Sequence, residues 1–478
     1  MQQNKGGEVE LFKLFGLFSI IFVPFLVAGT FEHFERFHQS AFVKYSDAED
    51  IAFKKYLDAE YKEFLLQVPL KRYSEKKPSR LSVTQSIQTP NVGPRVDMQI
   101  PSYKEPTIPP KQSLKNKDIV FDFFGVEVGF NFDKKIQDAK FYPRNQVGIS
   151  KFFEQLASSE YTYLVADIKL FIKQYHFNDW GLNLLVQKIT QKIFKQKDEA
   201  DIFRWFLLTK LGYDVHLSLV KKHIVLFFLT KQKVYDQYSI LFQKKRYYSL
   251  DKESFSKEIG SVYSYTHNYK NGLRKFDFAL QTLPLLSQNI KRKELYFREY
   301  ATKYTISFQY NQNIIDFLAT YPQLEEEVYF DAIIDPLTHR TLFLSLQKYV
   351  DAKRASGAIE FLLHFTQGAF EYKVDKKQFG YEKMMFAQET LVYDASDCED
   401  RAVLFSFLIQ KILHLSVVAL VYKNHFSTAL YIPLNGDKID VQGRDFIISD
   451  PSYLNANIGQ SLTQYRNKKP KKIIFVKK

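Results

Sequence analysis

The chain of 478 residues contains a single cysteine, Cys398. One thiol cannot form a disulfide within the chain, and it cannot build a structural zinc site from several cysteines. The fold must therefore be held together by a packed apolar core. The composition supports such a core, because 45% of the residues are hydrophobic and the chain contains 45 Phe and 31 Tyr. A chain of this length has room for about two to four domains.

An uncharged segment, Leu14–Ala28, lies close to the N-terminus. It is short for a membrane span, which needs roughly 20 residues, and it is typical of the core of a signal peptide. Gly29 offers a small residue for cleavage, whereas counting back to Leu11 gives a length that could anchor. We predict that residues 1–30 are a signal peptide or membrane anchor and expect an exported protein, in the periplasm or cell envelope. A buried N-terminal helix is the alternative.

The next two regions differ in composition. Residues 31–116 combine a charged, aromatic, helical stretch with a linker that holds seven prolines in Pro78–Pro110. Residues 117–251 predict a hairpin that turns near Gly125, then amphipathic helices. After these helices, Gly212 ends one more helix and strands follow.

The remaining chain predicts mixed structure. Residues 252–355 contain alternating apolar and polar positions, as around Phe276 and Phe278, which indicate a β-rich middle region ending in helices. Residues 356–478 predict a helix, Glu399–Leu413, followed by antiparallel strands. The expected fold class is therefore α+β.

The formal net charge is +14, and part of it lies at the C-terminal end. Arg466–Lys478 contains seven basic residues and no acidic residue. This segment predicts either a solvated tail or a contact with an anionic surface or envelope partner. Zinc-finger spacing, RNA-binding signatures and zipper heptads are absent from the sequence, so we expect no nucleic-acid partner.

Cys398 lies where a helix is expected to begin. Ser396 or Asp397 would cap this helix, which places the thiol in its first turn. Free N–H groups at a helix N-terminus stabilise a thiolate and can donate to an oxyanion. Asp397, Glu399 and Asp400 act in the opposite sense, because carboxylates that point at a thiol raise its pKa.

Two further residues complete a candidate catalytic set. His425 follows Cys398 by 27 positions, at the start of a strand, and Asp450 follows His425 by 25, at the end of the apolar strand Phe446–Ser449. A nucleophile on a helix, a base on one strand and an orienting acid on the next form a coherent thiol triad. The alternatives are a core cysteine, a structural histidine and a turn aspartate before Pro451.

These three motifs carry a resemblance to a known family. The run SDCEDRA from Ser396, the small polar residue before His425, and the Asp-Pro-Ser run at Asp450 resemble the three motifs of the transglutaminase-like superfamily, in order. The resemblance covers about residues 356–462. It implies a papain-like fold with catalytic roles for Cys398, His425 and Asp450. Phe426 and the serine after it replace the frequent Ala-Trp pair, which leaves the substrate groove unassigned.

An internal similarity appears when the sequence is shifted by 202 positions. Asp198, Ala200, Phe203, Leu211, Val215, Lys221 and His223 then fall on Asp400, Ala402, Phe405, Leu413, Val417, Lys423 and His425. Asp251 approaches the place of Asp450 with a slip of three residues, and Gln196 takes the place of Cys398. We therefore predict that residues 117–251 are a degenerate transglutaminase-like module without a thiol. Coincidence between two ordinary helix–strand units is the alternative.

The predicted function is a thiol-dependent amide hydrolase or acyl transferase, similar to a cysteine protease or transglutaminase. Its expected substrate is a peptide or protein. The alternative is a non-catalytic envelope binding or scaffold protein built on transglutaminase-like modules. The ten histidines form no HExxH motif, so we expect neither a metal nor another cofactor.

Overall fold

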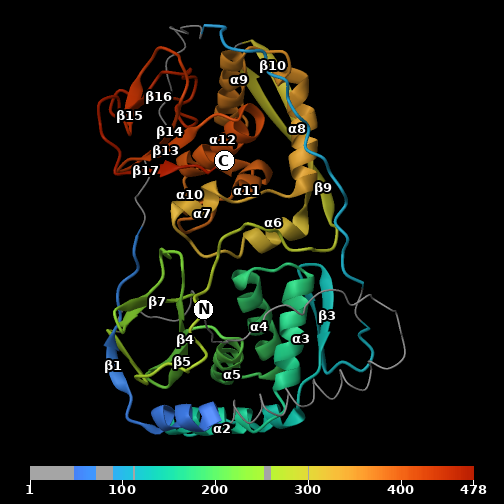
Figure 1. The fold of residues 1–478 in the computed structure, drawn as a ribbon, viewed down its shortest axis with the longest axis vertical. Coiled ribbons are helices and arrows are strands. Elements are labelled where there is room, and N and C mark those ends of the chain that lie inside the picture. The colour runs from blue at the N-terminus through green and yellow to red at the C-terminus, as the bar shows by residue number, and fades with distance from the viewer. Residues whose placement is uncertain (1–47, 72–89, 111–112, 252–259, 300, 478) are drawn as a thin grey trace, which may run out of the picture. The chain divides into compact units, whose positions relative to one another are not determined.

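The structure is a computed structural model that describes residues 48–71, 90–110, 113–251, 260–299 and 301–477 (Figure 1). The chain divides into two compact units, Met1–Ala52 and Phe53–Lys478. Residues 48–52 are the described part of the first unit, and they are helical. The predicted signal peptide or anchor, residues 1–30, lies outside the described residues. Among the described helices, none is long and apolar enough to cross a bilayer.

The first half of the second unit contains helices followed by strands. Its elements are β1 (Lys62–Leu65), β2 (Ile119–Phe123), β3 (Val126–Phe130), the 3-10 helix η1 (Lys134–Asp138), α2 (Gln146–Ala157), α3 (Thr162–Gln174), α4 (Asp179–Ile193), α5 (Lys197–Lys210), β4 (Val215–Val220), β5 (His223–Leu229), β6 (Ser239–Phe242), β7 (Lys245–Ser249) and β8 (Ser261–Ser264). The predicted hairpin is confirmed as β2–β3, which turns at Gly125 with φ +80°.

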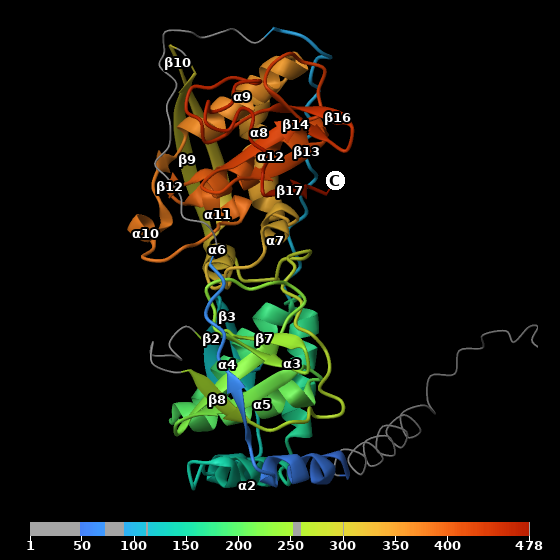
Figure 2. The ribbon, with the colours of Figure 1, turned by 90° about the vertical axis from the view of Figure 1, so that its left-hand side faces the viewer.

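Strands β1 and β4–β8 form a barrel-like antiparallel sheet in the order β1-β8-β4-β5-β7-β6 (Figure 2). Its two edges nearly meet, because Gln67, just beyond β1, exchanges backbone hydrogen bonds of 2.7 and 3.2 Å with Ser239 in β6. The enclosed side is filled by apolar side chains, including Phe227 and Tyr247. The sheet also includes β1 and β8, which lie outside the predicted span 117–251.

Helix α5 packs against β4 and β5 on one face of this sheet. Asp198 and Glu199 lie in its first turn and Lys210 in its last, which suits the helix dipole. Gly212 then takes φ +93° and ends the helix, as predicted. Alternate residues of β4, such as Leu217, join α5 in the main core.

The second half of the unit begins with a hairpin and continues through helices to a second sheet. Its elements are β9 (Ile290–Glu299), β10 (Thr302–Asn311), α6 (Gln312–Leu318), α7 (Glu326–Phe330), α8 (Pro336–Val350), α9 (Ala355–Gly368), β11 (Glu371–Tyr372), α10 (Asp375–Gln378), α11 (Ala387–Val392), β12 (Ala395–Ser396), α12 (Cys398–Leu413), β13 (Val417–Val421), β14 (Phe426–Leu430), β15 (Lys438–Val441), β16 (Arg444–Ile448) and β17 (Lys472–Phe475). Strands β13–β17 form a curled half-barrel in the order β15-β16-β14-β13-β17, and α12 packs on β13 and β14.

The two sheets share strand order, direction and register. The order β8-β4-β5-β7-β6 in the first sheet corresponds to β17-β13-β14-β16-β15 in the second. Val215 pairs with Phe228 and Val417 with Leu430, which is an offset of 202 for both partners. In the next pair of strands, Phe227 pairs with Ser249 and Ala429 pairs with Ile448. The offset is 202 between Phe227 and Ala429 and 199 between Ser249 and Ile448. The three-residue slip seen in the sequence therefore lies after β5 in the first sheet and after β14 in the second.

The middle region contains less strand than the sequence predicted. Only β8 and the long hairpin β9–β10 are regular strands in the described part of 252–355, while α6, α7 and α8 are helical. Phe276 and Phe278 do not form a regular strand. They are extended, and Phe276 makes one isolated bridge to Thr230 before both side chains enter the main core. Burial against neighbouring helices, rather than strand pairing, thus explains their alternation.

The described end of the proline-rich linker is packed rather than free. Val96 exchanges backbone hydrogen bonds with Ala352 and Lys353 at the junction of α8 and α9, and Pro94 accepts one from Ala355. In Figure 1 the light-blue chain follows α8. Residues 90–98 therefore form a strap on these helices, and this part of the predicted linker is packed on the fold.

The basic C-terminal segment is also part of the fold. Strand β17 pairs with β13 along four residues. Lys472 contacts both Glu326 and Glu327, at 2.8 and 2.7 Å, and Lys477 contacts Asp331. The expected solvated tail is therefore wrong for this stretch, because its apolar residues complete the second sheet.

Candidate active site

Cys398 is the first residue of α12 and follows the N-cap residue Asp397. The backbone N–H of Phe426 donates to the Cys398 sulfur over 3.2 Å. This contact joins the start of the helix to the start of β14, directly beside His425. The thiol is only 2% exposed.

His425 and Asp450 are in direct contact. His425 Nε2 lies 2.6 Å from Asp450 Oδ2. The two residues are close because β14 and β16 are adjacent and antiparallel, and each residue lies just outside its strand. With Nε2 held by the carboxylate, Nδ1 is the nitrogen left to exchange a proton with a thiol.

Asp450 is held by a set of short-range donors. Its Oδ1 accepts from Ser452 N and Oγ, at 3.0 and 2.9 Å, and from Tyr453 N at 3.2 Å. Burial alone would raise the pKa of Asp450, but His425 and the Ser452 donors lower it below its ordinary value. The group is therefore a rigid carboxylate at neutral pH, as an orienting acid must be.

Two buried side chains, Gln367 and Arg401, hydrogen-bond to the segments that carry Cys398 and Asp450. Gln367 on α9 donates to the backbone oxygens of Asp450 and Ala456, both at 3.0 Å. Arg401 on α12 donates to Gln367 O at 3.0 Å and to Ser396 Oγ at 3.1 Å. Helix α9 thus connects α12, which begins at Cys398, to the loop that carries Asp450.

A cluster of carboxyl groups lies beside the thiol. Cys398 Sγ is 3.6 Å from Glu399 Oε2, and oxygens of Asp375, Asp397 and Glu399 lie within 4.8 Å of one another. Carboxylates this close could share a cation or a proton. Burial, followed by the charges of Asp400 and Glu399, raises the pKa of Asp375 to about 9, so Asp375 is protonated at neutral pH.

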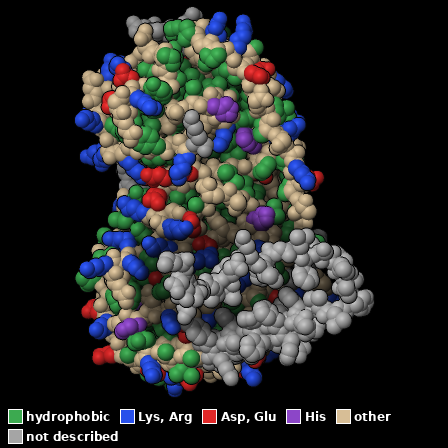
Figure 3. Space-filling model, viewed as in Figure 1, with side chains coloured by type: hydrophobic (Ala, Val, Ile, Leu, Met, Phe, Trp, Pro, Cys, Tyr) green, Lys and Arg blue, Asp and Glu red, His purple; other side chains and the backbone are tan. Residues whose placement is uncertain are grey.

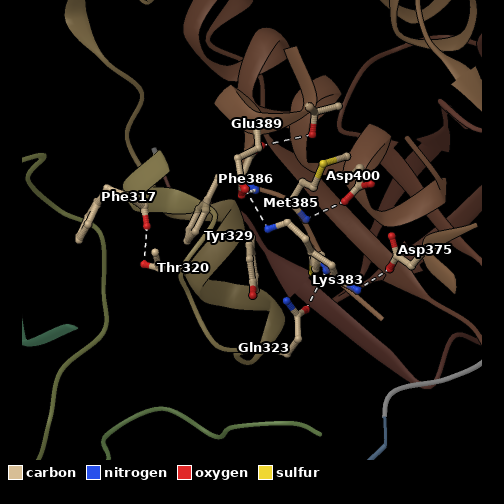
Figure 4. A network of polar contacts seen from close by, with 12 residues as sticks. Phe317, Thr320, Gln323, Tyr329, Asp375, Lys383, Met385, Phe386, Glu389 and Asp400 are labelled. Atoms are coloured by element: carbon tan, nitrogen blue, oxygen red, sulfur yellow. Dashed lines mark hydrogen bonds and ion pairs between the residues drawn. The ribbon is translucent and has the colours of Figure 1, made fainter. Parts of the chain in front are cut away.

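Backbone donors support the same cluster (Figure 4). Lys383 N donates to Asp375 Oδ2 at 2.6 Å, and Met385 N donates to Asp400 Oδ1 at 2.7 Å. The Lys383 ammonium group turns the other way and pairs with Glu389 at 2.8 Å. Burial and then the charge of Glu399 raise the pKa of Asp400 to about 7.

Tyr465 covers the imidazole. Its ring stacks on His425 with 4.9 Å between centroids and 10° between planes. Burial and the neighbouring Cys398 and Asp450 raise the pKa of Tyr465. Its turn is held down by Asp437, which accepts from Arg466 Nε at 3.0 Å. His425 is only 7% exposed, and Tyr465 contributes to its burial.

The first sheet carries different chemistry at the corresponding places. Ile224 N, the counterpart of Phe426 N, donates to Asp198 Oδ1 at 2.9 Å. A carboxylate, rather than Gln196, therefore takes the place of the thiol sulfur, because Gln196 is the N-cap of α5 and makes no side-chain capping bond. His223 faces this carboxylate at 3.3 Å, and its side chain is 72% exposed.

The acid position of the first sheet is also changed. Asp251 follows β7 as Asp450 follows β16, at the offset of 199. It pairs with Arg204 at 3.0 Å, and Arg204 is 1% exposed and also donates to Asn183. This carboxylate consequently orients an arginine of α5 instead of a histidine.

The structure therefore brings together the three residues selected from the sequence, Cys398, His425 and Asp450. It adds residues that the sequence did not indicate: Asp375, Gln367 and Tyr465. Arg401 belongs to the SDCEDRA run, but its contact with Gln367 across 34 positions and the contact of Gln367 with Asp450 across 83 positions follow no local pattern. Comparison with protein-family models, curated proteins and solved structures found no significant match.

Proposed function

We propose that the protein is a thiol-dependent amide hydrolase or acyl transferase of the transglutaminase-like type, acting on a peptide or protein. One observation carries the proposal: the Cys398 sulfur accepts the N–H of Phe426 at 3.2 Å, next to a His425–Asp450 pair 2.6 Å apart. The helix start, the two adjacent strands and the rigid carboxylate support the same roles. The hydrophobic segment Leu14–Ala28 supports an exported enzyme.

In the proposed mechanism His425 removes the Cys398 proton, and the sulfur attacks the carbonyl carbon of an amide. His425 then returns the proton to the leaving amine, which departs and leaves an acyl-thioester on Cys398. Water or a second amine attacks this thioester, which regenerates the thiol and gives an acid or a new amide. Asp450 holds the imidazole in position during both steps.

The first sheet supports a second part of the proposal. Its matching strand order and register suggest a degenerate transglutaminase-like module with a carboxylate, Asp198, at the thiol position. Asp198 cannot form an acyl-thioester. Asp251, at the acid position, pairs with Arg204, whereas His223 faces Asp198. We propose that this module contributes structure and binding instead of chemistry.

An anionic surface as partner of the C-terminal segment has less support. Lys472 and Lys477 already pair with acidic residues of the same unit. On the face shown in Figure 3, Lys and Arg side chains are spread out, with Asp and Glu among them. This pattern does not favour one continuous anion-binding surface on that face.

A non-catalytic scaffold is the competing function, and the environment of the thiol favours it. Cys398 is 2% exposed and has Glu399 at 3.6 Å, and an anionic neighbour disfavours the thiolate. Catalysis therefore requires that the imidazolium of His425 outweighs these carboxyl groups.

Alkylation of Cys398 by iodoacetamide distinguishes the two functions. We expect the wild type to react rapidly below about pH 7.5 through an imidazolium-stabilised thiolate. His425→Gln should slow the reaction by about tenfold or more in that range. His223→Gln, the matched change in the first sheet, should leave the rate unchanged.

Equal rate–pH profiles for the wild type and His425→Gln would contradict the catalytic proposal. Burial of the thiol could hide its reactivity, so the same pair is also compared on a Tyr465→Ala background, which removes the covering ring. A thiol that reacts only above about pH 8 in that background as well favours the scaffold.

A further inference from the structure

A pocket of about 510 Å3 lies at the C-terminal ends of α3 and α5, in the part of the chain that carries the first sheet. It is formed by one face of α3, the turn after it, the end of α5 and the extended segment 274–282. The volume falls within the range of about 300–1,000 Å3 that is usual for small-molecule sites. The pocket is separate from the residues proposed for catalysis.

The polar wall of this pocket is cationic. Lys169 and Lys173 lie four residues apart on α3 and therefore share one face, and His176 follows three residues later. Arg274 contributes from the extended segment and pairs with Asp179 at 2.6 Å. The described lining residues include no Asp or Glu. Lys169, Lys173 and Arg274 contribute three positive charges, and Asp179 contributes one negative charge. The net charge is therefore +2 even with His176 neutral.

The floor of the pocket is aromatic and apolar. Tyr213 and Phe177 line it together with leucine side chains. The Arg274 guanidinium lies over the Tyr213 ring at 4.2 Å, and Tyr213 stacks on Phe276 with centroids 4.2 Å apart. Tyr213 also donates to Asp179 Oδ1 at 2.5 Å, so both the ring and the guanidinium are fixed in place. Because Arg274 and Phe276 cover the two faces of the Tyr213 ring, the pocket combines positive charge with a fixed ring edge and apolar side chains.

His176 occupies a conformation that favours glycine. It follows α3 with φ +55°, and Phe177 N closes the helix by donating to Ile172 O at 3.1 Å. Glycine is the usual residue at this capping position, because a side chain there is strained. The imidazole of His176 lies at the edge of the cationic pocket.

The second sheet provides a comparison within the same molecule. A pocket of about 460 Å3 lies at the end of α12 and is lined by Leu413 and Leu415, the counterparts of Leu211 and Tyr213 at the offset of 202. Its other walls are mainly apolar, including Ile359. The shared frame thus leaves a hollow in both places. The cations and the tyrosine of the first pocket are not required by that frame.

We propose that the pocket of the first sheet binds a small phosphate ester. The phosphate, with about two negative charges at neutral pH, lies between Lys169, Lys173 and Arg274. The apolar or aromatic body of the ester lies against Tyr213 and Phe177. This charge matches the net +2 of the wall, and a carboxylate of similar size matches it less well.

Binding of phenyl phosphate, measured by calorimetry on the full chain, tests the proposal. We expect phenyl phosphate to bind at least about tenfold more tightly than inorganic phosphate, benzoate or phenol. The double variant Lys169→Gln/Lys173→Gln should weaken this binding by about tenfold or more, because hydrogen bonds to charged groups are strong. Equal affinity for phenyl phosphate and inorganic phosphate would overturn the proposal.

A structural role for Lys173, which lies in the last turn of α3, predicts a different outcome. Lys192→Gln, in the last turn of α4, is the matched control, and it should leave binding unchanged. His176→Gly should raise the midpoint of thermal unfolding and weaken phenyl phosphate binding. Unchanged binding in both His176→Gly and the double lysine variant would show that these side chains serve only the helix end.

Discussion

At the scale of single residues, the site depends on how negative charge is distributed around one thiol. Asp450 is ionised and points at His425, whereas burial raises the pKa of both Asp375 and Asp400. The carboxyl group that contacts His425 and two of the carboxyl groups near the thiol thus differ in the direction in which their pKa is shifted. In the proposed mechanism this difference favours an imidazolium beside the thiol at neutral pH.

Asp375→Asn should make the protein more stable at alkaline pH. An unfolded Asp has a pKa near 3.9, whereas the pKa of folded Asp375 is about 9. The folded state keeps a proton that the unfolded state releases, so this stability is complete below about pH 4 and is lost as the pH rises toward 9. Denaturant unfolding at about pH 8 should show a gain of at least about 1 kcal/mol for the variant.

Near pH 4 the same variant should match the wild type. Asp97→Asn, a change at an exposed position, serves as control and should have no effect at either pH. If the difference in unfolding free energy between Asp375→Asn and the wild type is the same at both pH values, Asp375 is ionised in the folded protein.

The candidate triad could be predicted from local sequence because Cys398 lies at a helix start, His425 just before a strand start and Asp450 just after a strand end. Gln367 could not be predicted, because its side-chain amide contacts the Asp450 backbone oxygen across 83 positions. Asp375 begins the four-residue helix α10 and Tyr465 lies in a turn, so neither belongs to a periodic segment, and only the packing of the chain brings them near the thiol. Sequence thus indicates the proposed reacting groups better than the groups that surround them.

At the scale of elements, the turn that carries Tyr465 lies over His425 in the proposed site. Tyr465→Ala should raise the rate of Cys398 alkylation severalfold, because the ring lies flat on His425 and the thiol is buried. Tyr431→Ala, at a tyrosine that is 49% exposed, is the control and should leave the rate unchanged. An unchanged rate in Tyr465→Ala would mean that another element covers the thiol.

The strap of residues 90–98 should depend on Gly93. Its φ is +92°, and an added Cβ would lie 3.0 Å from the Cβ of Ala355. Gly93→Ala should therefore cost about 1–2 kcal/mol for the left-handed backbone, with a further cost for the contact. Gly443→Ala has a similar φ of +78° and open space around it, so it should show only the backbone cost. If Gly93→Ala and Gly443→Ala lose the same unfolding free energy, the strap moves away from Ala355 without a measurable cost.

Helices and central strands were predictable, whereas edge strands were not. The helices α2 to α5 lie in the region where the sequence predicts amphipathic helices, and α12 agrees with the predicted Glu399–Leu413 to within one residue, because their apolar periodicity is long. Strands β15 and β17 are four residues each and begin with lysine. Such short segments become strands only because a partner with an unpaired edge lies beside them.

At the scale of the whole molecule, the unit Phe53–Lys478 has one continuous core. The main core contains Trp180 and Trp205 from the first half together with Cys398 and Phe426 from the second. We expect one cooperative unfolding transition. Tryptophan fluorescence, which reports on the first half, and Cys398 labelling, which reports on the second, should give the same denaturant midpoint. Midpoints that differ would show two independently folding parts.

The shared register of the two sheets has a consequence for how this chain can vary. The three-residue difference between the sheets falls in the connection after the second strand, where an insertion breaks no ladder bond. The pairings before and after it are unchanged. A carboxylate takes the thiol position in the first sheet, and the aspartate at the acid position pairs with an arginine there and with a histidine in the second sheet. The frame and the side-chain contacts are thus separable. Exchange of matched positions between the two sheets would show which residues make the frame reactive.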